Sequence, residues 1–84
     1  MYRLLYDRKV FKELDKLSNT DAARVQNAMN SLKENPLPHG NKKLSGVSGL
    51  YRLRQGNYRI IYTVNHSHKT VHVLSVGDRK DIYR

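Results

Sequence analysis

Three arginines lie close together in the second half of the chain, in a pattern that suits phosphate binding. Arg52 and Arg54 alternate with apolar residues in the stretch Leu50–Arg54, and Arg59 follows after a short polar gap. If the stretch is a β-strand, its successive side chains point to opposite faces, so Arg52 and Arg54 share one face. A hairpin turn at residues 55–57 then brings Arg59 close to them. Guanidinium groups stay charged and bind phosphate oxygens in a planar, bidentate geometry, which predicts a binding site for a polyanion.

The elements that must position these arginines are indicated by the spacing of apolar residues. Residues 1–6 alternate in the way that an opening strand does. Apolar residues then recur at helical spacing, which predicts a helix over residues 8–17 and a second helix that starts near residue 20. Pro36 and Pro38 cannot continue the second helix, so we expect an extended loop there.

From Leu50 onward the period is two, which predicts three strands at residues 50–54, 58–64 and 70–76. An opening strand, a helical hairpin and a three-stranded antiparallel meander make an α+β fold, with the helices packed on one face of a single sheet. We expect one domain over residues 1–84. The arginines then belong to the other sheet face, for which the alternative is an ordinary solvated surface.

The charge of the chain indicates what binds this face. The sequence has 16 Lys and Arg against 7 Asp and Glu, a formal net charge of +9. The first 34 residues hold seven basic and five acidic side chains, and the last 50 hold nine basic and two acidic. A positive field of this kind favours a nucleic acid, and the main alternative is an acidic protein partner.

Other features of the sequence indicate in which compartment the protein is found and which structural elements it lacks. The chain has no cysteine, which excludes disulfides and thiolate zinc sites. The stretch Met1–Asp7 lacks the apolar core of a signal peptide, and no apolar run approaches the roughly 18 residues of a membrane-spanning helix. We therefore expect a soluble, cytoplasmic protein.

Four stretches of the chain, in their order and spacing, resemble the RelE/ParE superfamily of bacterial and archaeal toxins: Lys42–Gly46, Leu50–Arg54, Tyr58–Tyr62 and Val76–Tyr83. The resemblance covers nearly the whole chain and implies a RelE-like fold. Members of the RelE branch cut messenger RNA, often in the ribosomal A site, whereas the ParE branch poisons DNA gyrase. The match favours the RelE-like mRNA interferase branch, because the nuclease positions of that branch are basic here as well.

RelE-like nucleases use basic residues at two alternating positions of the second strand, an Arg in the third, an Arg after the last strand and a C-terminal Tyr. The resemblance therefore implies the following catalytic residues: Arg52, Arg54, Arg59, Arg79 and Tyr83. The best-known pattern has Lys at the first two positions and a slightly longer stretch before the Tyr, which leaves the individual roles open. Four further basic residues are expected to bind RNA phosphates: Lys42, Lys43, Lys80 and Arg84.

RNA carries its own nucleophile, so a protein can cleave it by orienting the 2′-hydroxyl and stabilising the charge that develops. Arginine is a poor proton shuttle because its pKa lies above about 12. For Tyr83 two roles remain open, acceptance of a proton and stacking on a splayed base.

The histidines are expected to be structural or solvated, because none falls on a position that the resemblance marks: His39, His66, His68 and His72. His66 and His68 lie in a predicted turn without a carboxylate or cysteine to complete a metal site. We therefore expect no metal and no other cofactor.

The resemblance also implies partners and alternatives. A toxin of this kind needs a cognate, RelB-like antitoxin, expected to fold on its surface as a partly disordered acidic or amphipathic segment. The other implied partners are messenger RNA and the ribosome. The alternative functions are inhibition of DNA gyrase and nucleic-acid binding without catalysis.

Overall fold

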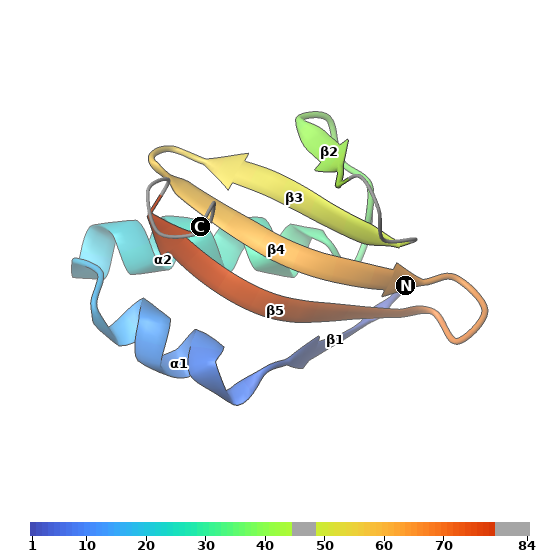
Figure 1. The fold of residues 1–84 in the computed structure, drawn as a ribbon, viewed down its shortest axis with the longest axis horizontal. Helices are drawn as coiled ribbons and strands as arrows, with labels where there is room; N and C mark the ends of the chain where they lie inside the picture. The colour runs from blue at the N-terminus through green and yellow to red at the C-terminus, as the bar shows by residue number, and fades with distance from the viewer. Residues whose placement is uncertain (45–48, 79–84) are drawn as a thin grey trace.

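A single sheet of five strands forms the body of the protein in the computed structural model, which describes residues 1–44 and 49–78 (Figure 1). The strands are β1 (Arg3–Tyr6), β2 (Asn41–Lys43), β3 (Leu50–Gln55), β4 (Tyr58–Asn65) and β5 (Thr70–Asp78). Their spatial order is β1-β5-β4-β3-β2. β1 pairs with β5 in parallel, and the other neighbours are antiparallel. The predicted α+β fold and its antiparallel meander are thus confirmed.

Two helices, α1 (Arg8–Asp15) and α2 (Asn19–Ser31), connect β1 to the rest of the sheet. Each begins at a side-chain cap. Asp7 accepts a hydrogen bond from the backbone N–H of Lys9, and Ser18 accepts one from that of Asp21. The described helices include none that is long and apolar enough to cross a membrane.

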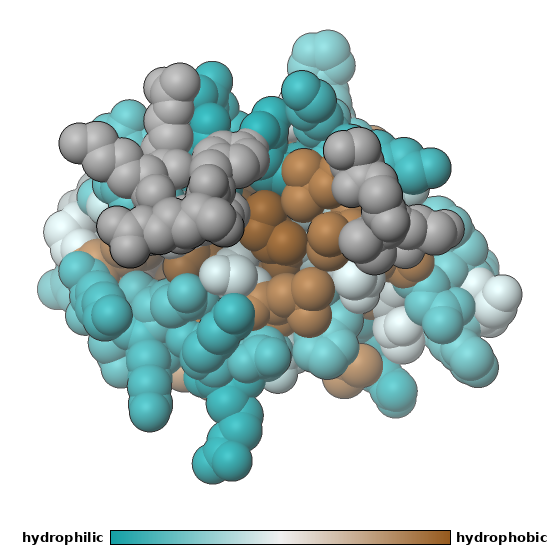
Figure 2. All heavy atoms as spheres, viewed as in Figure 1, coloured by the Kyte–Doolittle hydropathy of each residue, from teal (hydrophilic) through white to brown (hydrophobic). Residues whose placement is uncertain are grey.

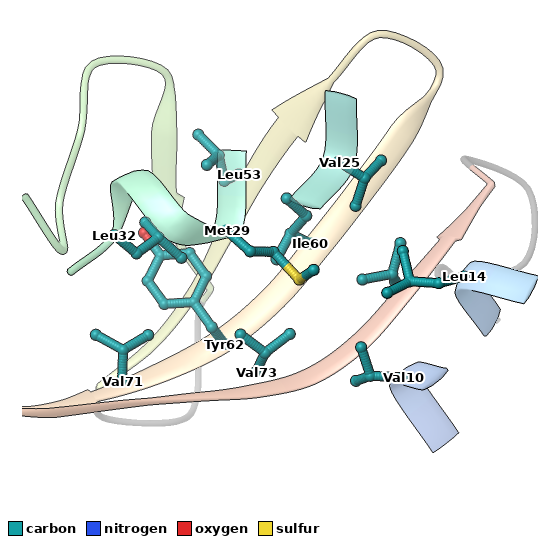
Figure 3. Packing of buried hydrophobic residues seen from close by; sticks show 11 residues of the cluster. Val10, Leu14, Val25, Met29, Leu32, Leu53, Ile60, Tyr62, Val71 and Val73 are labelled. Carbon is teal, nitrogen blue, oxygen red and sulfur yellow. The ribbon is translucent and has the colours of Figure 1, made fainter. Parts of the chain in front are cut away.

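The core lies between the helices and one face of the sheet (Figure 3). Val10 and Leu14 of α1 pack towards β5, and Val25 and Met29 of α2 pack over β3 and β4. Tyr62 of β4 is fully buried among them. Both helices therefore cover the same face, as predicted, and the opposite face of β3, β4 and β5 is not covered by either helix. We call it the open face.

β2 was not predicted. The sequence predicts a loop before the sheet, where Lys42 and Lys43 lie, but residues 41–43 pair with β3 as an edge strand of three residues. A strand of three residues is too short to show an alternation of apolar and polar residues in the sequence. Its hydrogen-bond partners are supplied by β3. The correction matters because β2 contains Lys42 and Lys43.

A bulge in β5 resets which side chains reach the core. Ile61 pairs with Ser75 but the next residue, Tyr62, pairs with Val73, so Leu74 is an extra residue. Val73 and Val76 consequently both face the core although they are three positions apart. Ser75 and Gly77 are left on the open face.

Candidate functional site

The alternation of β3 places two of the predicted arginines on the open face. Leu53 is buried in the core, so Arg52 and Arg54 on either side of it point the other way. The register then aligns Arg54 with Arg59 of β4 and Arg52 with Ile61. Because cross-strand partners lie on the same face, the three arginines share one surface.

Lysine joins this group through the unpredicted strand. Lys42 of β2 is the cross-strand partner of Arg52, so it also belongs to the open face. Lys43 is the partner of Tyr51, which packs against the core, and it therefore belongs to the opposite face. Of the two predicted RNA-binding lysines, the structure brings only Lys42 to the arginines.

The resulting basic cluster, Lys42, Arg52, Arg54 and Arg59, contains two pairs of like charges directly opposite each other. Directly opposed residues have Cβ atoms about 4.5–5.5 Å apart, so the four cationic side chains are concentrated on a small part of the sheet. Such a concentration of positive charge attracts a polyanion. The cluster thus has the chemistry of a phosphate-binding site.

The arginines of the cluster differ in exposure. Arg54 is exposed and Arg52 half-buried, whereas Arg59 is only 4% exposed. The sequence pattern predicts that Arg59 lies on the exposed rim or face of the sheet, and this prediction is wrong. Arg59 lies on the central strand β4, between β3 and β5, and its guanidinium group is buried together with its aliphatic stem.

A hollow of about 810 Å³ borders the cluster. Its lining includes Ile61 and Gly77, which are the cross-strand partners of Arg52 and Arg59. Leu50 and Leu74 add apolar surface to it. Figure 2 shows apolar side chains gathered in the middle of the face turned to the viewer, with hydrophilic ones around them. Basic and apolar surfaces therefore adjoin here.

α1 closes one side of this hollow through Glu13, a residue that the sequence did not single out. The Glu13 carboxylate accepts hydrogen bonds from the backbone N–H of Val76 (2.8 Å) and from the Ser75 hydroxyl (3.1 Å). It thereby fixes α1 to the part of β5 that β1 does not reach. No local sequence signal marks such a contact, since its partners are 62 and 63 residues apart in the chain.

Three tyrosines have a raised pKa, which makes their hydroxyl groups less ready to lose a proton. The hydrogen bond that Tyr58 donates to Asp21 (3.0 Å) raises its pKa, and burial adds to the effect. Burial raises the pKa of Tyr62 to about 12, and its hydroxyl donates to the carbonyl of Pro36. Burial also raises the pKa of Tyr6. These three phenols are held neutral and are unsuited to accept protons as phenolates.

His66 and His72 are not cross-strand partners of any residue of the basic cluster. His66 is hydrogen bonded through Nδ1 to the Tyr2 hydroxyl, at 2.7 Å. His72 pairs with Thr63, towards the other end of β4 from Arg59. Within residues 1–44 and 49–78, no three His, Cys, Asp or Glu side chains come together in a way that could hold a metal ion.

Four predicted site residues lie outside the described residues: Arg79, Lys80, Tyr83 and Arg84. The last described residue, Asp78, pairs with Tyr58, and Gly77 before it pairs with Arg59. The roles of Arg79, Lys80, Tyr83 and Arg84 stay predictions from the sequence.

Comparison with known proteins gives one family. Residues 4–83 match the family model of the ParE toxin of the type II toxin-antitoxin system, parDE. The chain is 33% identical over 86 aligned positions to the mRNA interferase toxin RelE of Escherichia coli strain K12, covering 98% of this chain and 90% of that protein. It is 38% identical over 63 positions to toxin RelG of Mycobacterium tuberculosis, covering 75% and 72%.

A solved structure has the same fold. The archaeal RelE-RelB complex of Pyrococcus horikoshii OT3 contains a chain that matches with a TM-score of 0.84 and 32% identity, covering 95% of this chain and 97% of that one.

Proposed function

Because the chain belongs to the ParE/RelE family of type II toxins, we propose that it is an endoribonuclease toxin that cuts messenger RNA bound on the open face of its sheet. The observation that carries the proposal is the basic cluster. It consists of two directly opposed like-charge pairs, Lys42 with Arg52 and Arg54 with Arg59, beside a hollow that is lined in part by apolar side chains.

The two surfaces suit the two parts of a nucleotide. Guanidinium groups bind phosphate oxygens bidentately, and apolar surface accepts the face of an unstacked base. Side chains two positions apart on a strand are separated by roughly 7 Å, so Ile61 lies one such step from Arg59. A phosphate on the arginines therefore leaves its base within reach of the hollow.

The reaction needs no nucleophile from the protein. The 2′-oxygen attacks phosphorus, the bond from phosphorus to the 5′-oxygen breaks, and the products are a 2′,3′-cyclic phosphate and a 5′-hydroxyl. The arginines stabilise the charge on the phosphoryl oxygens, and no metal takes part. The 2′-hydroxyl loses its proton to a base and the 5′-oxygen gains one from an acid.

Tyr83 and Arg79 complete this mechanism in our proposal. Tyr83 either accepts the 2′-proton or stacks on the base, and we favour stacking or positioning. Protonation of the 5′-oxygen then falls to Arg79, to ribosomal RNA or to water. We further propose that cutting takes place on the ribosome in the cytoplasm, where the message is held extended and single-stranded.

The decisive experiment uses a defined message with and without ribosomes, followed by mapping of the cut ends. We expect cyclic phosphate or 3′-phosphate ends and no cutting at a site that carries a single 2′-deoxy substitution. Cutting of the message without ribosomes should continue in EDTA, an arm that is confined to the free message because ribosomes themselves need Mg²⁺. Cutting of the free message that stops in EDTA, or cutting that leaves 5′-phosphate ends at the deoxy position, would contradict the mechanism.

A second function has one observation in its favour, namely that the matching family model is described as a ParE toxin. The ParE branch inhibits DNA gyrase. Supercoiling of plasmid DNA by purified gyrase separates the two functions, because an RNA-cutting toxin leaves it unchanged. RNA binding without any cutting under the conditions above would instead indicate a non-catalytic binding module.

The cognate partner of this toxin is a RelB-like antitoxin. The solved relative from Pyrococcus horikoshii is a complex of RelE with RelB. An antitoxin is necessary because free nuclease would stop protein synthesis in the cell that makes it.

A further inference from the structure

The open face of the sheet extends beyond the basic cluster and the hollow. Val71 and Val73 on either side of His72 are buried in the core, so the His72 side chain belongs to the open face. The strand register aligns four side chains in one row across this part of the face, one from each of β1, β5, β4 and β3: Leu5, His72, Thr63 and Leu50. We call these four residues the His72 row.

The His72 row combines an aromatic ring with apolar surface. His72 and Thr63 are half-buried, and Leu5 is 41% exposed. A single exposed leucine is common on soluble proteins and by itself indicates nothing. An imidazole ring, however, can stack on the face of an unpaired base, and its ring nitrogens can form hydrogen bonds with the base edge. The row therefore has the chemistry of a base-binding site.

The hollow lies between the basic cluster and the His72 row, so three zones follow one another along β4. Arg59 belongs to the basic cluster, Ile61 to the hollow and Thr63 to the His72 row. Side chains two positions apart on a strand are separated by roughly 7 Å, so Thr63 lies about 14 Å from Arg59. This length corresponds to about four nucleotides at the 3.4 Å spacing of a stacked strand, and to fewer in an extended one. One strand of RNA can therefore reach all three zones.

A cation lies beyond the His72 row. Arg3 is exposed, is two positions from Leu5 on β1 and pairs with Thr70 of β5, so it belongs to the open face. Among the described strands the one acidic residue is Asp78, at the other end of β5 from Thr70. Positive charge thus lies at both ends of a strip of apolar and aromatic side chains. This arrangement matches a chain that carries phosphates on either side of its bases.

We propose that the His72 row is a second base-binding site, in which His72 stacks on a base two or three nucleotides away from the phosphate held by the basic cluster. Arg3 binds a phosphate beyond that base. The proposal rests on the proposed function, since it takes RNA to be bound on the open face. It extends that function because the toxin then holds several consecutive nucleotides, and RNA length contributes to its affinity.

The test compares the Kd values of two RNAs by fluorescence anisotropy, a hexanucleotide with a 2′-deoxy substitution at the cut site and a dinucleotide from its centre. His72→Ala should raise the Kd of the hexanucleotide at least about fivefold, the lower end of what stacking of one base contributes, and leave that of the dinucleotide unchanged. His72→Phe keeps an aromatic ring and should stay within about threefold of the wild type. His39→Ala is the matched control, because His39 is an exposed histidine between α2 and β2, outside the sheet.

Arg3→Ala tests the other end of the track. It should weaken binding of the hexanucleotide and reduce the magnitude of its salt slope by about 0.7, the value of one phosphate on a single strand. The dinucleotide should show no such change. Arg8→Ala is the control, because Arg8 is an exposed arginine of α1, outside the sheet.

Three results would overturn the proposal: equal Kd values of the wild type for the two RNAs, a hexanucleotide Kd for His72→Ala within twofold of the wild type, and an equal loss for both RNAs. The last result would assign His72 a structural role. If His72→Ala fails to fold, the ring protons of His72 in the wild type decide, because stacking shifts their NMR signals with the hexanucleotide and not with the dinucleotide. Cutting of a message on ribosomes is measured separately. If the wild type fails to cut, the proposed function fails while the Kd values still report on the His72 row.

Discussion

Arg54 and Arg59 face each other across β3 and β4 but differ in burial, and this difference predicts different outcomes for the same substitution. Both Arg54→Ala and Arg59→Ala should abolish RNA cutting and toxicity. Arg54→Ala removes an exposed like charge, so stability should be unchanged or rise by up to about 1 kcal/mol at low salt. Arg59→Ala empties a buried site and should cost about 1–3 kcal/mol.

Urea unfolding and growth arrest at matched expression levels measure the two effects. Arg24→Ala is the control, because Arg24 is an exposed arginine on α2, outside the basic cluster. Normal growth arrest by Arg54→Ala would remove that residue from the site. Equal stability of Arg59→Ala and the wild type would contradict the burial of Arg59.

Arg79 and Tyr83 are predicted site residues that lie outside the described residues. Arg79→Ala should abolish toxicity. Tyr83→Phe distinguishes the two roles of Tyr83, because Phe keeps the ring and loses the hydroxyl. A base contribution is worth about 10²- to 10⁴-fold in rate, so a loss of only a few-fold in single-turnover cutting indicates stacking. Wild-type growth arrest by Arg79→Ala would exclude Arg79 from the reaction.

The raised pKa of Tyr62 predicts how the stability of the protein changes at alkaline pH. Its folded-state pKa of about 12 lies above the ordinary value of 10, so the folded protein holds the proton more tightly than the unfolded chain. The contribution is fully present below pH 10 and is lost as the pH rises towards 12. We expect a loss on the order of 2 kcal/mol across this window in urea unfolding. Tyr62→Phe should be less stable at neutral pH but should show a smaller further loss, and an unchanged alkaline slope would contradict the assignment.

At the scale of the elements, the sequence predicts the parts that have a regular period. The apolar spacing of α1 and the alternation around Leu53 depend on local pattern alone, so the two helices and the face of Arg52 and Arg54 were predicted correctly. β2 has three residues and owes its pairing to β3. Its contribution to the basic cluster through Lys42 could therefore not be predicted.

The bulge and the burial of Arg59 were missed for a related reason. Leu74 is extra only relative to β4, and a single sequence does not contain the register between two strands. Arg59 follows a turn in a polar stretch, which suggests exposure, but its side chain is only 4% exposed in the folded protein. Local pattern therefore predicts the face on which a residue lies, whereas its burial depends on what packs around it in the fold.

The link between α1 and β5 gives a prediction at this scale. Glu13→Ala leaves the Val76 N–H and the Ser75 hydroxyl without their acceptor, and hydrogen bonds to charged groups are worth about 1.5–3 kcal/mol. We expect a stability loss in that range and slower RNA cutting, because Gly77, the partner of Arg59, directly follows Val76. Ser75→Ala keeps the backbone bond and should cost less. Equal stabilities of Glu13→Ala and Ser75→Ala would contradict the role of the backbone bond.

At the scale of the whole molecule, the net charge of +9 attracts any polyanion, but the fold decides which charges gather on one surface. Lys42 and Lys43 are adjacent in the chain and carry the same charge. The register of β2 assigns them to opposite faces, so they form a matched pair for testing whether RNA binds the open face.

The salt dependence of RNA binding reports how many phosphates the protein neutralises. For a single strand, the slope of log K against log salt is about −0.7 per neutralised phosphate. If each of the four residues of the basic cluster neutralises one phosphate, the slope is about −2.8 or steeper. Lys42→Ala should reduce that magnitude by about 0.7, whereas Lys43→Ala should leave it nearly unchanged. Fluorescence anisotropy with a short labelled RNA from 50 to 200 mM salt is sufficient, because a slope of −2.8 corresponds to about a 50-fold loss of affinity over this range. Equal slopes for the two lysine variants would show that contact with RNA is not confined to the open face, and a flat response in the wild type would remove the basic cluster from RNA binding altogether.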